Sequence, residues 1–182
     1  MEKLGKVLLL CLLIVPAYAD EKPSAALSPN RLQITACAEG AAVINATDPD
    51  FAFGAGLRYY VPLNPLATIV FHGEFMRRNT FFKMNSIDLS GLVIFGREFY
   101  YGLGLYLGLV LNMEQVYGWK TKSSADFGWV ADIGYHFSNP NITAGFSVHM
   151  GLTDLQPKQT NRGGFINQTN IRWGLWLGYQ IL

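Results

Sequence analysis

Charged residues are scarce in this chain. They make up 15% of its 182 residues, and the formal net charge is +1, whereas average soluble domains carry roughly 25% charged residues. A nucleic-acid-binding protein normally shows a basic stripe, so the near-zero net charge argues against that class. Hydrophobic residues reach 50%, which excludes an intrinsically disordered chain. The length suits one domain.

Long apolar runs are missing after the first residues of the chain. The longest candidate, residues 102–111, is interrupted by glycines and covers about half of the ~20 residues that a membrane-spanning helix needs. This excludes a helical membrane protein. Cysteine is nearly absent as well. Cys11 lies in the leader described next, so Cys37 has no partner for an internal disulfide, and we interpret it as a small packed residue.

The first residues have the pattern of a secretory signal peptide. Lys3 and Lys6 give a positive start, residues 7–15 are apolar, and Ala17-Tyr18-Ala19 is a small-x-small cleavage site. An uncleaved membrane anchor is the alternative, but the apolar stretch is too short to span a bilayer. We predict a signal peptide at residues 1–19, a periplasmic tail at residues 20–30 and one folded domain at residues 31–182.

Apolar residues recur at every second position through that domain. In the last segment, Ile171, Trp173 and Leu175 share one face, and Arg172 and Gly174 share the other. Such alternation is typical of a β-strand that separates two environments. It recurs in eight segments with no helical period, at residues 32–39, 51–61, 67–76, 87–96, 101–112, 127–137, 142–153 and 171–181.

The connections between these strands alternate in length. Turn-forming residues occupy 62–65, 97–99 and 138–141, whereas looser and more polar segments occupy 45–50, 77–83, 116–124 and 155–170. Short turns at one end and longer loops at the other are typical of an outer-membrane barrel with both termini on the periplasmic side.

Lysine indicates which face meets lipid. A water-facing barrel wall carries many Lys and Glu residues, yet after the predicted cleavage site lysine occurs only at positions 22, 83, 120, 122 and 158, in the tail, in predicted loops or at a strand end. The polar face consists instead of Gly, Ser, Thr and Tyr with scattered charges, which suits a crowded interior. Aromatic residues lie near the strand ends of the apolar face, as in interfacial girdles: Tyr59, Tyr101, Trp129, Tyr135, Phe137, Trp173 and Tyr179.

Lipid offers no hydrogen bonds, so membrane-spanning strands must close into a cylinder. Eight strands enclose room only for side chains. The sequence therefore predicts an all-β protein, a closed eight-stranded antiparallel up-and-down transmembrane β-barrel without an open general pore. A soluble periplasmic ligand-binding β-barrel is the alternative.

Two segments carry a resemblance to a known family. The strand at residues 100–108 (YYGLGLYLG) and the terminal strand at residues 173–182 (WGLWLGYQIL) resemble the small eight-stranded outer-membrane barrels of the OmpA/OmpX type. The resemblance implies the outer membrane of a Gram-negative bacterium, contact with outer-membrane lipids and lipopolysaccharide, and insertion by the barrel-assembly machinery. Family members usually end in an aromatic residue, whereas this chain ends in Leu182.

Several charged residues fall on the predicted inward face. We expect them to form a paired network, because buried charges persist only when they are paired. If Leu182 lies near Arg31 at closure, antiparallel counting brings Arg172 close to Glu39, and this pair would join the first strand to the last. The predicted interior network comprises Glu39, Arg58, His72, Glu74, Asp88, Asp132, His136, His149 and Arg172.

An enzyme is the other alternative, since some small outer-membrane barrels deacylate or acylate lipid A. His136 and Ser138 imitate the His-x-Ser pair of the deacylases, but they lie at a short turn and no Glu follows Glu114. Ser147, His149 and Asp154 supply the residue types of a hydrolytic triad. We expect no enzymatic activity. We also expect no metal or cofactor, because no cysteine–histidine cluster has zinc-ligand spacing and no glycine-rich loop precedes a helix.

The long loops hold the candidate binding residues, because binding functions usually reside in loops on a rigid scaffold. Aromatic and cationic side chains there could contact lipopolysaccharide phosphates, a host surface or another envelope protein; a solvated loop with an interfacial tryptophan is the alternative. The candidates are Tyr117, Trp119, Lys120, Lys122, Lys158 and Arg162. The sequence predicts an envelope-structural or surface-interaction role.

Overall fold

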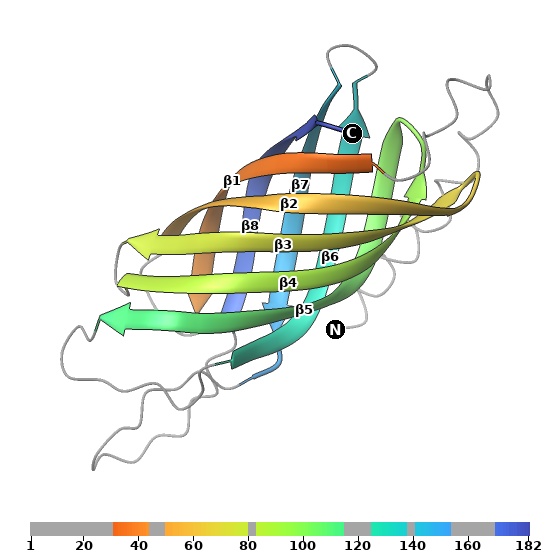
Figure 1. Cartoon of the computed structure of the whole chain (residues 1–182). Coiled ribbons are helices and arrows are strands. Elements are labelled where there is room, and N and C mark those ends of the chain that lie inside the picture. The colour runs from red at the N-terminus through yellow and green to blue at the C-terminus, as the bar shows by residue number, and fades with distance from the viewer. Residues whose placement is uncertain (1–30, 44–49, 80–82, 115–124, 138–140, 154–169) are drawn as a thin grey trace.

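The computed structural model (Figure 1) describes residues 31–43, 50–79, 83–114, 125–137, 141–153 and 170–182. The predicted signal peptide and periplasmic tail, residues 1–30, lie outside this part of the chain. Within it, no helix is long and apolar enough to cross a membrane. The strands are β1 (Arg31–Val43), β2 (Asp50–Asn64), β3 (Ala67–Asn79), β4 (Lys83–Gly96), β5 (Phe99–Glu114), β6 (Ala125–His136), β7 (Ile142–Gly151) and β8 (Asn170–Gln180).

These strands form one closed antiparallel barrel. Each pairs with the next, and β1 pairs with β8. The strands are steeply tilted, so that in Figure 1 those on one side of the barrel run across those on the other. At the seam Ala38 lies opposite Leu175, and beyond the paired residues the amide of Ile181 donates to the carbonyl of Leu32 over 2.9 Å. The predicted closed eight-stranded fold is confirmed.

The first short turn differs from its predicted position. β2 continues through Pro62 to Asn64, so the turn contains only Pro65 and Leu66 instead of residues 62–65. The strand tolerates Pro62 because the pairing register shifts between Pro62 and Asn64, and irregularities of this kind are where a sheet accepts proline. The Asn64 Oδ1 atom then accepts hydrogen bonds from the amides of Leu66 and Ala67, at 2.9 and 2.8 Å.

The strands also extend into the predicted loops. β3 reaches Asn79 and β4 begins at Lys83, so most of the segment predicted as a loop at residues 77–83 is strand. β5 continues to Glu114. The segments predicted as loops at 116–124 and 155–170 lie almost wholly outside the described residues, and so do residues 45–49 and 138–140.

The apolar side of each strand faces outward. Ile34 and Leu175 are 51% and 68% exposed, whereas their chain neighbours Thr35 and Trp176 are 1% and 3% exposed. This order is the inverse of a water-soluble barrel, where the apolar residues would fill the interior. The orientation predicted from the lysine distribution is confirmed, and an apolar wall of this kind needs lipid as its solvent.

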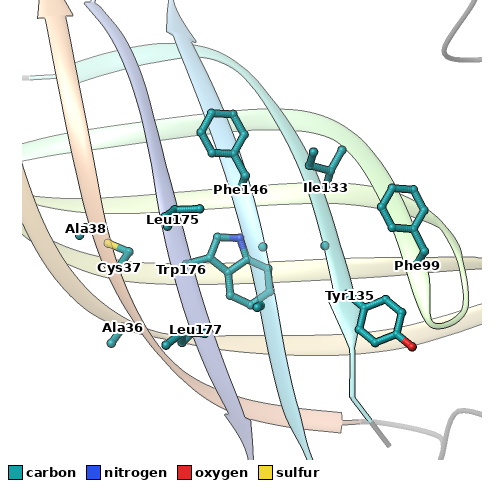
Figure 2. Close-up of a pocket in the computed structure, with 13 residues that line it drawn as sticks. Ala36, Cys37, Ala38, Phe99, Ile133, Tyr135, Phe146, Leu175, Trp176 and Leu177 are labelled. Atoms are coloured by element: carbon teal, nitrogen blue, oxygen red, sulfur yellow. The ribbon is translucent and has the colours of Figure 1, made fainter.

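A broad recess lies on the outward face where β1, β8, β7 and β6 lie side by side (Figure 2). Small residues, among them Ala36, Ala38 and Ala144, line it together with larger ones such as Phe146 and Leu177, and its volume is about 720 Å³. Because the lining is apolar, acyl chains of a surrounding bilayer would fill this space.

Aromatic side chains gather at the end of the barrel that carries the short turns. Phe95 stacks on Tyr101 with ring centroids 5.6 Å apart, and Tyr135 packs edge-on against Phe137 at 4.9 Å. Tyr179, near the end of β8, lies at the same end of the barrel and is 54% exposed. The tyrosine rings at this position are amphipathic groups suited to the boundary between acyl chains and headgroups.

Inside the barrel, large rings lie on glycines of the neighbouring strand. The register pairs Tyr100 with Gly134, Tyr106 with Gly128 and Trp176 with Gly145. A Cβ atom at Gly145 would lie 2.5 Å from the indole of Trp176, and one at Gly134 would lie 2.5 Å from the Tyr100 hydroxyl. The inward glycines therefore make the room into which these rings pack.

We predict that Gly145→Ala destabilises the barrel by about 1–3 kcal/mol, because the added methyl group overpacks a site that cannot expand. Trp176 cannot move away freely, since its indole N–H donates to Asp132 over 2.9 Å. The matched control is Gly91→Ala, where an added Cβ meets nothing within 4 Å. The control should be neutral or stabilise by about 0.4–1 kcal/mol. Urea unfolding in lipid vesicles measures both, and equal effects at the two positions would contradict the packing account.

Candidate functional site

The charged residues predicted for the interior are all described by the structure, and all are buried. They come from every strand except β5, so the tilted barrel directs groups far apart in sequence into one space. Their exposed fractions are Glu39 3%, Arg58 3%, His72 8%, Glu74 4%, Asp88 6%, Asp132 2%, His136 8%, His149 5% and Arg172 1%.

One ion pair is centred on Arg58. Its Nη1 atom donates to Asp132 Oδ2 over 2.6 Å, which joins β2 to β6 across the interior. The second oxygen of Asp132 accepts the indole N–H of Trp176 at 2.9 Å, and the guanidinium carbon of Arg58 lies 3.6 Å from the centre of the Trp176 ring. Hydrogen bonding and cation–π contact together satisfy a charge that would otherwise be costly to bury.

A second ion pair is centred on Arg172. Its Nη1 atom donates to Asp88 on β4 and lies 3.5 Å from Glu39 Oε2 on β1. The pairing of β1 with β8 places Ala41 opposite Arg172, so Glu39 is two residues along the strand, on the same inward side. The structure thus brings Arg172 near Glu39, as antiparallel counting predicts, but gives its hydrogen bond to Asp88.

A third interaction, which the sequence does not predict, joins Tyr106 to Asp126. The Tyr106 hydroxyl donates to Asp126 Oδ2 over 2.7 Å, and Asp126 is 4% exposed. The guanidinium carbon of Arg172 lies 5.2 Å from the Tyr106 ring centre, which links this pair to the second ion pair. Asp126 precedes the first residue predicted for its strand, although continuing the alternation by one residue would have placed it on the inward face.

Polar side chains joined by hydrogen bonds fill the interior at the turn end. The Tyr60 hydroxyl donates to Gln33 Oε1 over 2.9 Å, and the Gln33 amide donates to the Thr143 hydroxyl over 2.8 Å. Thr143 Oγ1 also lies 2.8 Å from His136 Nδ1, and the His136 ring stacks on Tyr100 with centroids 4.8 Å apart. This network ties β1, β2, β6 and β7 together and occupies that end of the barrel.

The residues considered for an enzyme are only partly described. Ser147 and His149 are both 5% exposed inside the barrel. The His149 ring packs edge-on against Tyr106 at 5.1 Å, and its Nδ1 atom lies 3.7 Å from Glu39 Oε1. Ser138 and Asp154 lie outside the described residues.

The predicted binding residues of the loops also lie outside the described part of the chain. These are Tyr117, Trp119, Lys120, Lys122, Lys158 and Arg162. Their role stays a prediction.

We predict that Arg172→Ala destabilises the barrel by about 3–5 kcal/mol, because it leaves the buried carboxylates of Asp88 and Glu39 without their cation. Glu39→Ala should cost less, since Arg172 keeps its hydrogen bond to Asp88. The control is Arg97→Ala at an exposed turn, expected within about 0.5 kcal/mol of the wild type. A heat-modifiability gel ranks the stabilities of the variants by the temperature at which each folded barrel shifts to the position of the unfolded chain. If Arg172→Ala behaves like the control, the ion pair has no stabilising role.

Comparison with known proteins shows the fold. No family model and no curated protein matches the chain. Among solved structures, Neisserial surface protein A (NspA) is 16% identical, with a TM-score of 0.53 over 82% of this chain and 96% of that one. A de novo designed transmembrane β-barrel is 11% identical, with a TM-score of 0.52 over 86% of this chain and 100% of that one. The outer membrane protein OprG from Pseudomonas aeruginosa is 11% identical, with a TM-score of 0.51 over 84% and 96%. The chain therefore shares the architecture of small transmembrane barrels.

Proposed function

We propose that this protein is an integral outer-membrane barrel of a Gram-negative bacterium, with an envelope-structural or surface-interaction role, no open general pore and no enzymatic activity. The observation that carries the proposal is the orientation of the strands. Outward side chains are apolar, whereas inward ones form ion pairs and hydrogen bonds. Such a molecule is stable only where lipid surrounds it.

The filled interior supports a role other than general diffusion. Arg172, Tyr100, Tyr106, Met76 and Leu92 are among the largest side chains with less than 2% exposure. They come from β8, β5, β3 and β4, so they project into the barrel from several sides. Barrels of this strand number hold side chains instead of an aqueous channel.

The outer membrane is the compartment that best fits the whole chain. The predicted signal peptide at residues 1–19 would carry the chain across the inner membrane. Two of the similar structures are those of a surface protein and an outer membrane protein. We propose that this chain likewise inserts through the barrel-assembly machinery and contacts outer-membrane lipids and lipopolysaccharide.

A surface-interaction role would reside in the long loops. Lys120, Lys122, Lys158 and Arg162 are cations in segments between strands, and we propose that they contact anionic groups such as lipopolysaccharide phosphates. A host or envelope protein is a further proposed partner of the same loops. Cations suit phosphate because charge-assisted hydrogen bonds are the stronger ones.

Fractionation of cells tests the location. The full chain expressed in a Gram-negative host should sediment with outer-membrane vesicles, stay there after a carbonate wash and migrate faster on a gel before boiling than after it. The physical reason is that a closed barrel resists detergent until heated. Recovery of the folded chain in the soluble periplasmic fraction would overturn the proposal in favour of a soluble ligand-binding barrel.

Charge reversal tests the surface role. Replacement of Lys120, Lys122, Lys158 and Arg162 by Glu should weaken binding of lipopolysaccharide to the barrel, since each cation near an anionic membrane surface contributes about 1 kcal/mol. Arg97→Glu is the control, because Arg97 lies at an exposed turn on the opposite end. Co-sedimentation with lipopolysaccharide and resistance of the cells to detergent are the two measurements. If neither changes in the fourfold variant, the loops do not act by this charge.

A further inference from the structure

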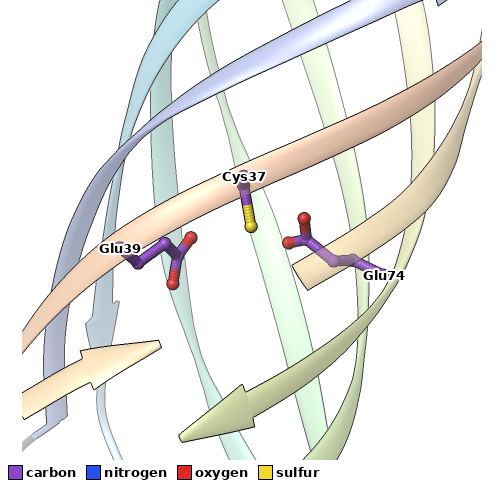
Figure 3. Close-up of side chains that lie close together, drawn as sticks. All are labelled: Cys37, Glu39 and Glu74. Carbon is purple, nitrogen blue, oxygen red and sulfur yellow. The ribbon is translucent and has the colours of Figure 1, made fainter. Parts of the chain in front are cut away.

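A thiol and two carboxylates meet inside the barrel, beside the ion pair of Arg172, to which Glu39 also belongs. Figure 3 shows Cys37 and Glu39 of β1 and Glu74 of β3 with their side chains directed toward one another. One donor atom from each residue lies within 4.8 Å of the others. Glu39 and Glu74 are 3% and 4% exposed. Two buried acids and a half-buried thiol thus share a small volume.

The intervening strand makes this meeting possible. β2 lies between β1 and β3 and places Gly54 opposite both Cys37 and Met76, and Gly56 opposite Glu74. A Cβ atom at Gly54 would lie 2.9 Å from Cys37 Sγ, and one at Gly56 would lie 3.1 Å from the Glu74 Cβ. Side chains of β1 and β3 therefore reach each other across two residues that have none.

The charge balance around the cluster is negative. Among the side chains whose burial the structure describes, the buried carboxylates are Glu39, Glu74, Asp88, Asp126 and Asp132, whereas the buried guanidinium groups are Arg58 and Arg172. Arg58 pairs with Asp132, and Arg172 lies between Asp88 and Glu39. An excess of buried negative charge is costly unless protons or a cation offset it.

Among the described residues, no arginine lies within ion-pair distance of Glu74. Its Oε1 atom is buried and accepts no hydrogen bond, and the nearest cationic candidate, His72 Nε2, is 4.0 Å away. The side chain points toward Cys37 and Glu39 (Figure 3). A buried carboxylate oxygen without a donor, aimed at a thiol and a second carboxylate, has the arrangement of a ligand for a cation.

We propose that Cys37, Glu39 and Glu74 bind a zinc-type divalent cation. Thiolate and carboxylate are among the ligands that Zn²⁺ takes in proteins. The thiolate disfavours calcium and magnesium, which prefer oxygen, and the two carboxylates disfavour monovalent copper. A second sulfur atom, that of Met76, lies 3.4 Å from Cys37 Sγ. It is a soft, polarizable atom that lines the site.

Binding requires only small movements. Zn–S and Zn–O bonds of ~2.3 and ~2.0 Å place tetrahedral donors about 3.5 Å apart, so donors now up to 4.8 Å apart would draw together. Arg172 can retain Asp88 while Glu39 turns to the metal. The Cys37 thiol proton leaves to solvent as the sulfur–metal bond forms, and the divalent cation offsets the excess of carboxylates.

The spacing of these ligands explains why the sequence predicts no metal. Cys37 and Glu39 are two residues apart, but Glu74 is on a different strand. None of them belongs to a cysteine–histidine pair with zinc-ligand spacing. Only the pairing of β1, β2 and β3 brings them together.

Metal retention tests the proposal. The full chain, purified from membranes in detergent, is unfolded in urea with a chelator, refolded into detergent with Zn²⁺ or Co²⁺ alone, and separated from free metal. We expect one Zn²⁺ per folded chain, a thiolate-to-cobalt charge-transfer band in the Co²⁺ form, and a higher unfolding temperature with Zn²⁺ than without it.

Two variants locate the site. Cys37→Ser should abolish the charge-transfer band and stoichiometric Zn²⁺ retention, and Glu74→Gln should abolish retention while keeping the shape of the side chain. The controls are Glu98→Gln at an exposed turn and Ser147→Ala inside the barrel, which should bind metal as the wild type does. The heat shift on a gel shows that each variant is folded, and either variant alone suffices if the other fails to fold.

Two results would overturn the proposal. One is a folded wild-type chain that retains no Zn²⁺ after refolding in its presence. The other is equal retention by the wild type and both cluster variants, which would mean adventitious metal only. Neither result bears on the proposed outer-membrane role, because the fractionation experiment measures location without reference to metal.

Discussion

The absence of water from the bilayer core is the constraint on which this structure depends. Lipid cannot hydrogen-bond to a backbone amide or carbonyl, so each strand needs a neighbour on both sides. The pairing of β1 with β8 meets this need for the last two edges. Once the barrel is closed, its two faces have different solvents, and residues such as Leu175 face lipid while their chain neighbours face the interior. The alternation of the sequence follows from this division.

The interior then has to satisfy polar groups without bulk water. Arg58 and Arg172 each donate a hydrogen bond to a carboxylate and make a cation–π contact with an aromatic ring. Inward glycines supply the space for those rings, as Gly145 does for Trp176. The same property of glycine brings the side chains of β1 and β3 together over β2, where Cys37 and Glu74 meet. The pattern of small and large inward residues therefore determines both how the rings pack and which charged side chains meet in this barrel.

The sequence predicts much of this fold because a period of two residues is visible without tertiary information. It also predicts the proximity of Arg172 to Glu39, since a closed antiparallel seam fixes which residues face each other. It cannot predict that Arg172 donates its hydrogen bond to Asp88, because contacts across the interior depend on strand tilt and side-chain reach. The turn at Pro65 was misplaced for a local reason. Proline favours turns, and a register shift that admits Pro62 into a strand leaves no signal in the alternation.

The similarity to a designed barrel limits what the fold says about function. A sequence that is 11% identical to this one and was designed as a transmembrane barrel adopts the same architecture. The architecture therefore follows from the lipid constraint. Any specific activity has to lie in the loops or the interior.

The orientation of the strands is the central claim, and a charged substitution on the outward face tests it most directly. Leu175 lies midway along β8, opposite Ala38 and Phe146, whereas Leu66 lies in a turn. Urea unfolding in lipid vesicles should show that Leu175→Arg costs about 2–4 kcal/mol and Leu66→Arg about 0–1 kcal/mol, because the penalty for an exposed arginine depends on membrane depth. Equal and small costs at both positions would show that water, not lipid, surrounds the barrel.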